Sequence, residues 1–133
     1  MNKDIKEFYE WYKENGLSDT DEHFITDVTM TLSTVKYKDN LPEERMRNNV
    51  PKMWERCQND WTDARLPDYA DITEITFSTY KSIIKSGVKK DFSIEELLYS
   101  LYKQGLCAPL ALDLLKTAHT RLAEQMIENH SNR

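Results

Sequence analysis

Apolar side chains recur every three or four positions along most of the chain, which is the pattern of helices that bury one face. In the N-terminal segment this pattern predicts a helix over residues 3–15 that ends at Gly16, a residue suited to a left-handed helix stop. The stripe of this helix consists of Ile5, Phe8, Tyr9 and Tyr12. Trp11 lies off the stripe, so we expect it either at the edge of the core or exposed to solvent.

The next segment fits two structures. Ser18 followed by the acids of DTDE is typical of a helix start, because carboxylates stabilise the positive N-terminal end of a helix. Residues 23–37, HFITDVTMTLSTVKY, also alternate Val28, Met30 and Leu32 with threonines, as a strand would. The start signal and the length favour a helix over residues 23–37, and a strand is the alternative.

Two prolines mark the segment that follows. Pro42 is placed where the first turn of a helix tolerates it, whereas Pro51 is expected to break or kink the helix after Val50. Beyond the break, helical spacing puts one line of residues on the same face. These residues are Val50, Trp54, Cys57 and Trp61. RLPDYAD, residues 65–71, is expected to be a connector.

In the second half of the chain, capping patterns mark where helices are expected to begin. Asp71 with Glu74 predicts a helix start, and this helix should run to a stop at Gly87. Ser93 with Glu96 forms a second capping pattern and predicts another helix.

The helix that begins near Ser93 is expected to stop at Gly105, and Pro109 then begins the last helix. One stripe along this last helix contains Ala111, Leu114, Leu115, Ala118, Leu122 and Met126. Residues 129–133 should fray at its end. With three glycines and four prolines in 133 residues, long loops are disfavoured. The sequence therefore predicts an all-α protein, a single domain over residues 1–133 that is a compact bundle of five or six short helices.

Composition narrows the kind of partner. The net charge is −5, which repels the phosphates of nucleic acid and favours a protein with a basic surface. The charged N-terminal segment lacks the apolar stretch of a secretion signal, and no apolar run is long enough to span a membrane. Cys57 and Cys107 have neither zinc-binding nor CxxC spacing, so we expect reduced thiols and a cytoplasmic protein.

The glycine turn at Gly105 raises the alternative of a helix-turn-helix regulator that binds DNA through residues 94–122. A DNA-reading helix needs polar donors in its first turns. Here the second helix begins with CAPLALDLL, residues 107–115, which offers no Arg, Lys, Asn or Gln. A corner between two core helices is therefore the favoured interpretation.

No catalytic or cofactor-binding motif is present. The sequence lacks GxSxG, HExxH, a P-loop and GxGxxG, so we expect neither an enzyme nor a bound cofactor. His23 and Asp27 lie four residues apart and could share a metal ion, but the sequence supplies no ligand from a second element. We therefore expect no metal site.

The remaining signal is a region rich in the residue types that anchor protein interfaces. The residues expected to bind a partner are Trp61, Arg65 and Tyr69 as anchors, with Asp19, Asp21 and Glu22 as steering charges. The expected function is that of an inhibitor or regulator that occludes a basic surface of another protein, as immunity proteins, antitoxins and phage accessory proteins do. A second copy of the chain is also considered as a partner, because an aromatic face could pair with itself.

Overall fold

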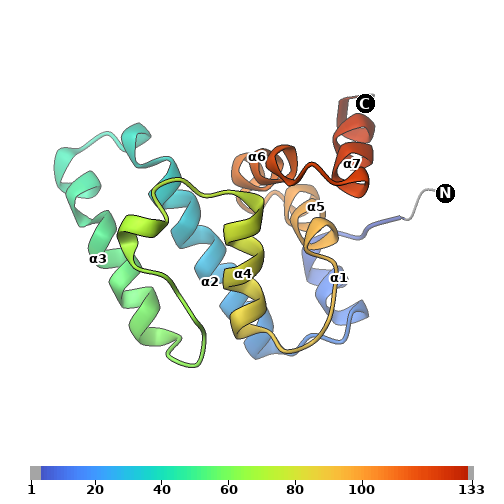
Figure 1. The fold of residues 1–133 in the computed structure, drawn as a ribbon, viewed down its shortest axis with the longest axis horizontal. Coiled ribbons are helices and arrows are strands. Elements are labelled where there is room, and N and C mark those ends of the chain that lie inside the picture. Colours follow the sequence, from blue (N-terminus) through green and yellow to red (C-terminus); the bar gives the residue numbers. More distant parts are fainter. Residues whose placement is uncertain (1–3, 132–133) are drawn as a thin grey trace.

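The computed structural model describes residues 4–131, with side chains up to residue 129. These residues form seven α-helices, two short 3-10 helices and no strand (Figure 1). The α-helices are α1 (Phe8–Glu14), α2 (Asp19–Lys36), α3 (Glu44–Asp60), α4 (Phe77–Gly87), α5 (Ile94–Gln104), α6 (Ala108–Ala118) and α7 (Arg121–Ser131). The 3-10 helices are η1 (Lys38–Asn40) and η2 (Tyr69–Asp71). The all-α prediction is confirmed, whereas the expected number of five or six helices was too low.

Helix α1 is shorter than predicted, and the residues that it buries are not all those of the predicted stripe. It begins at Phe8, so residues 4–7 are not helical, and residue 3 lies outside the described residues. Trp11 is buried, with 2% of its surface exposed, whereas Tyr9, which was assigned to the apolar stripe, is 45% exposed. The ring of Trp11 packs edge-on against Phe92, and its indole N–H donates to Glu96. Partners on α5 and on the loop before it therefore bury this tryptophan.

Helix α2 runs unbroken from Asp19 to Lys36, so the strand alternative for residues 23–37 was wrong. The side chains of Ser18 and Asp21 form a reciprocal capping box that fixes its start. The hydroxyl groups of four of its threonines, Thr26, Thr29, Thr31 and Thr34, form hydrogen bonds. Thr31 donates to the carbonyl of Asp27, and Thr29 is hydrogen-bonded to the Tyr80 hydroxyl at 2.8 Å.

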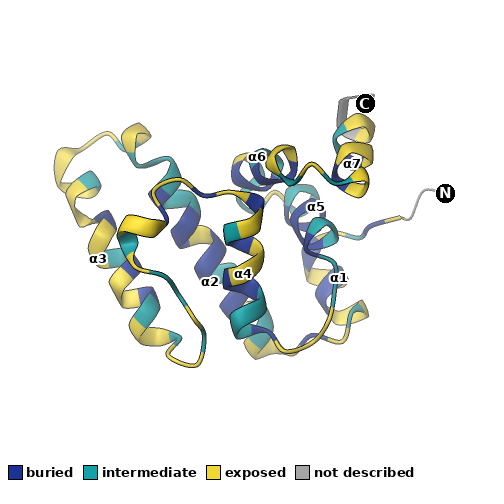
Figure 2. Cartoon of the chain, viewed as in Figure 1, coloured by how far each residue is buried: buried dark blue, intermediate teal, exposed yellow. Residues whose placement is uncertain are grey.

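Helix α3 continues through Pro51, so the predicted break after Val50 does not occur. Pro51 is exposed, and the carbonyl that loses its amide donor lies on the same side of the helix. Val50, Trp54 and Cys57 face inwards, and α3 packs beside α2 at one end of the molecule (Figures 1 and 2).

Helix α4 begins later than the capping pattern at Asp71 and Glu74 predicted. Its N-cap is Thr76, whose hydroxyl accepts from the amide of Thr79. The segment before it buries Ile72 and Ile75 without forming an α-helix. The apolar spacing of these two isoleucines was therefore mistaken for the first turn of a helix.

The predicted last helix is two helices. His119 has a φ of +55°, which ends α6, and the Thr120 hydroxyl accepts from the amide of Ala123 to begin α7. After this break Ala123 is buried, whereas Leu122, expected on the stripe, is exposed. Of the tail expected to fray at 129–133, residues up to Ser131 belong to α7, and residues 132 and 133 lie outside the described part.

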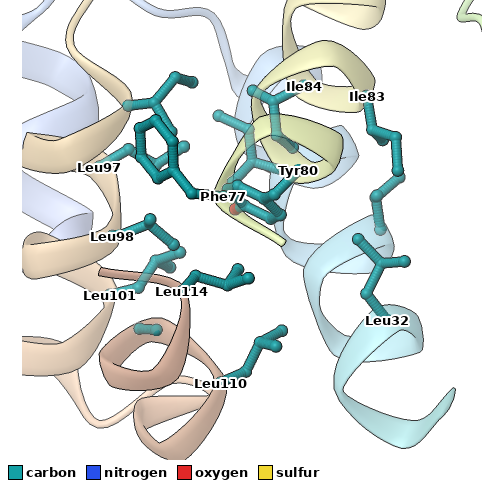
Figure 3. Packing of buried hydrophobic residues seen from close by; sticks show 14 of the residues in the cluster. Leu32, Phe77, Tyr80, Ile83, Ile84, Leu97, Leu98, Leu101, Leu110 and Leu114 are labelled. Atoms are coloured by element: carbon teal, nitrogen blue, oxygen red, sulfur yellow. The ribbon is translucent and has the colours of Figure 1, made fainter. Parts of the chain in front are cut away.

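The centre of the core lies between α2, α4, α5 and α6 (Figure 3). The fully buried side chains that meet there include Leu32, Tyr80, Ile84, Leu97, Leu98, Leu110 and Leu114. Gly105 is left-handed, with φ +80°, and ends α5 as predicted. Helices α5, α6 and α7 lie on the far side of α2 from α3, so α3 forms an outer edge of the molecule against α2 (Figure 1).

Candidate functional site

Trp61 stands at the C-terminal end of α3 and folds back across α2. Its ring packs edge-on against Phe24, with centroids 5.3 Å apart and an interplanar angle of 79°. Its indole Nε1 donates a 2.7 Å hydrogen bond to Asp27 Oδ2. The side chain is half-buried, so one part of the ring is fixed against α2 while another part meets solvent.

Asp27 also accepts from the thiol of Cys57, with 3.8 Å between Sγ and Oδ2. Burial, and next the charge of Asp27, raise the pKa of the Cys57 thiol to about 12. Burial also raises the pKa of Cys107, which is half-buried at the start of α6. Both cysteines are free, and both remain protonated near neutral pH, which makes them poor nucleophiles.

Three hollows follow α2 along its border with α3. The first, of about 260 Å³, is lined by Thr20, Asp21, Phe24, Asp60, Trp61, Thr62, Asp63, Ala64, Gly87 and Lys89. The second, of about 390 Å³, is lined by Glu22, His23, Thr26, Asp27, Met30 and Trp61. The third, of about 180 Å³, is lined by Asp27, Met30, Thr31, Thr34, Met53 and Arg56. Trp61 is shared by the first and second hollows, and Asp27 and Met30 by the second and third, so together they form one surface, which we name the α2–α3 groove.

The apolar part of the α2–α3 groove is exposed to solvent. Met30 is 52% exposed, and Met53 and Trp61, which also line the groove, are half-buried. Of the other large apolar side chains that the structure shows exposed, Tyr9 and Leu122 lie on helices outside this edge, and Met46 is in the first turn of α3. Met30 and the half-buried Met53 and Trp61 therefore form a small apolar strip along the groove.

Carboxylates border this apolar strip. Those that line the groove are Asp21, Glu22, Asp27, Asp60 and Asp63. Lys89 lies at one end of the groove and Arg56 at the other. The Nζ of Lys89 donates to the carbonyl of Ser86 at 2.9 Å, and the described residues show no ion pair between Lys89 and these acids. Negative charge therefore dominates the surface around Trp61.

The structure brings together three of the six residues predicted to bind a partner. Trp61, Asp21 and Glu22 line the α2–α3 groove. Asp19 is on the same helix, but its carboxylate accepts a 3.1 Å hydrogen bond from the Tyr12 hydroxyl of α1.

The other two predicted anchors lie apart from the groove. Arg65 borders a different hollow, of about 330 Å³, together with Asp71 and residues of α4. The hydroxyl of Tyr69 accepts from Lys38, whose Nζ also lies 5.6 Å from the centre of the ring. Trp61, Arg65 and Tyr69 are therefore close in the sequence but do not form one continuous surface.

Sequence reasoning missed Met30 and Met53, and it considered Asp27 as a metal ligand or as part of an acidic edge but not as a partner of Trp61. The signal for Met30 was available, because an apolar residue on the polar side of a helical α2 has no core to enter. Asp27 instead fixes the indole of Trp61. Within residues 4–131 no group of three or more His, Cys, Asp or Glu side chains is arranged to hold a metal ion.

The turn between α5 and α6 presents little to DNA. The exposed side chains of α6 are Pro109, Lys116 and Thr117. Thr117 is already engaged, because its hydroxyl accepts from the amide of Phe77 and donates to the carbonyl of Leu114. Asp113 accepts a hydrogen bond from the Tyr37 hydroxyl. The helix therefore offers a single exposed cation, and nothing in its geometry favours the DNA-binding alternative.

Comparison with models of protein families, with curated proteins and with solved structures found no significant match. None of the helices in residues 4–131 combines the length and the apolar character that crossing a membrane requires.

Proposed function

We propose that this protein is a binding module that inhibits or regulates a basic partner protein by covering part of its surface. The observation that carries the proposal is the exposed Met30 beside Trp61 in a groove bordered by carboxylates. Met30 has no obvious structural role, because it points away from the core, and Asp60 and Asp63 are exposed at the rim of the groove.

The two kinds of groups would act at different stages of binding. Carboxylates such as Glu22, Asp60 and Asp63 attract a basic surface from a distance and raise the rate of association. Met30 and Trp61 then provide apolar contact that slows dissociation. Trp61 needs little ordering on binding, because Asp27 and Phe24 already fix its ring.

Affinity capture from an extract of the native host tests this function, with the whole chain as bait at low and at high salt. The bait is compared with the double variant Glu22→Lys/Asp63→Lys, which reverses two charges of the groove. The matched control is Glu43→Lys/Glu44→Lys, which makes the same change in net charge at two exposed acids at the start of α3.

The proposal predicts a basic protein that the wild type and the control retain at low salt, that high salt releases and that the groove variant does not retain. Equal loss with both variants would show that only net charge matters. Nucleic acid in place of protein in the eluate would contradict the proposal and favour the DNA-binding alternative.

A further inference from the structure

We propose that the α2–α3 groove binds one amphipathic helix of the partner, about four turns long, with apolar residues on one face and Lys or Arg beside them. This inference rests on the proposed function and specifies the chemistry of the segment that the groove accepts.

The shape of the groove determines the length of this segment. Its lining residues follow α2 from Thr20 to Thr34. At a rise of about 1.5 Å per residue, this part of α2 spans about 21 Å, which is the length of a helix of about fourteen residues. A globular protrusion would fill one hollow, whereas a rod-shaped segment can occupy all three.

The secondary structure favours a helical segment over an extended one. An extended peptide binds most readily by adding a strand to the edge of a sheet, where backbone groups are unpaired. Residues 4–131 contain no strand, and most of the groove is formed by α2 and α3, helices whose backbone groups are paired along most of their length; only its end near Thr20 includes non-helical residues, 61–64 and 89. The segment must therefore be recognised by its side chains, and a helix presents apolar side chains in a row at i, i+3 or i+4, and i+7.

The walls of the groove are suited to such a row of apolar side chains. On one side the indole of Trp61 is fixed by its bond to Asp27, so it forms a rigid partition between the first two hollows. Met30 and Met53 line the rest, and their unbranched thioether side chains adapt to the shape of an inserted residue. Each hollow can then receive one apolar side chain of the bound helix.

The charges are distributed unevenly along the groove. At the end near Thr20, Asp21, Asp60 and Asp63 outnumber the single cation Lys89, whereas at the end near Thr34 Arg56 faces one acid, Asp27. The bound helix should therefore carry its Lys or Arg residues over the end near Thr20, and a neutral or acidic residue over Arg56.

The methionines provide an experiment, because Met30 and Met53 line the groove and Met46 and Met126 do not. The whole protein, labelled with ¹³C in its methionine methyl groups, is titrated at low salt with a fourteen-residue peptide of Leu and Lys at helical spacing. A peptide of the same composition with strictly alternating Leu and Lys is the control ligand. The variants are Met30→Lys and, as a matched exposed methionine outside the groove, Met46→Lys.

We expect the helical peptide to shift the methyl signals of Met30 and Met53 and to leave those of Met46 and Met126 unchanged. Met30→Lys should weaken binding at least tenfold, Met46→Lys less than twofold, and the alternating peptide should bind at least tenfold more weakly. Equal binding of the two peptides, or equal shifts of all methionines, would overturn the helix proposal. If host capture still depends on Glu22 and Asp63, the proposed function survives that result; if capture fails as well, both fall.

Discussion

The indole N–H of Trp61 is hydrogen-bonded to Asp27 at 2.7 Å, and this contact joins the end of α3 to the middle of α2. Asp27→Ala should lower the free energy of unfolding by about 1–2 kcal/mol, because it removes a hydrogen bond to a carboxylate. It should also increase quenching of tryptophan fluorescence by acrylamide. That signal reports Trp61, since Trp11 and Trp54 are 2% and 0% exposed.

Asp63→Ala is the control for the loss of a groove carboxylate, because Asp63 is exposed and lines the same border. We expect it to change stability by less than about 0.5 kcal/mol and to leave quenching unchanged. An Asp27→Ala protein with unaltered quenching would show that the bond does not hold Trp61 in place.

Gly87 is required by the packing of Phe24 and not by a left-handed turn. A Cβ atom added at Gly87 would lie 2.2 Å from Phe24 Cζ, and this glycine is not among those with positive φ. Gly87→Ala should therefore destabilise the protein by about 1–3 kcal/mol, although alanine is the better helix former. Chemical denaturation of wild type and variant measures this difference.

A double-mutant cycle isolates the cause of that destabilisation. In a Phe24→Ala background the clash is absent, so Gly87→Ala should cost less than about 0.5 kcal/mol or become stabilising. An undiminished cost in that background would assign the effect to the backbone of Gly87 and not to the ring of Phe24.

The break between α6 and α7 can be tested with two glycine substitutions that should change the free energy of unfolding in opposite directions. His119 has a φ of +55°, so His119→Gly should stabilise the protein by about 0.5–1 kcal/mol. Ala118→Gly, one residue earlier and still helical, should destabilise it by a similar amount. A single helix through this region would make both substitutions destabilising, so thermal unfolding of the two variants distinguishes the two structures.

The thiol of Cys57 makes stability depend on alkaline pH. Its pKa is raised from 9.0 to about 12 by burial and by Asp27, so the folded state retains a proton that the unfolded chain releases. The resulting stability is complete below pH 9 and is lost as the pH rises from 9 towards 12. Between pH 8 and pH 10 we expect a loss of about 1 kcal/mol from this group.

Cys57→Ala provides the comparison for that pH profile. The variant is expected to be less stable throughout, but its free energy of unfolding should fall by about 1 kcal/mol less than that of the wild type between pH 8 and pH 10. Urea unfolding at each pH measures both slopes, and parallel slopes would show that Cys57 is not the responsible group.

The apolar periodicity was sufficient to predict the fold class and most helices, because each helix buries one face. It failed where apolar residues are buried without an α-helix, as at Ile72 and Ile75, and where the stripe continues across a break, as at His119. A positive φ at a histidine has no signal in the sequence. Pro51 failed as a breaker because its position on an exposed face lets the helix continue.

The candidate site was predictable only in part. The enrichment of Trp61 and acids indicated residues that line the α2–α3 groove, but Arg65 and Tyr69 were grouped with Trp61 by sequence distance alone. The groove depends on the packing of α2 against α3, which places Met30 beside Trp61 from a point 31 residues away. Patterns within a short stretch of sequence cannot show that Met30 and Trp61 lie side by side.

Amide hydrogen exchange of the protein, alone and with its captured partner, tests the central claim most directly. The account predicts that the partner slows exchange in residues 20–34 and 53–64, which form the α2–α3 groove, and leaves α7 unchanged. Slowed exchange confined to residues 94–122, with no change along α2 and α3, would contradict it.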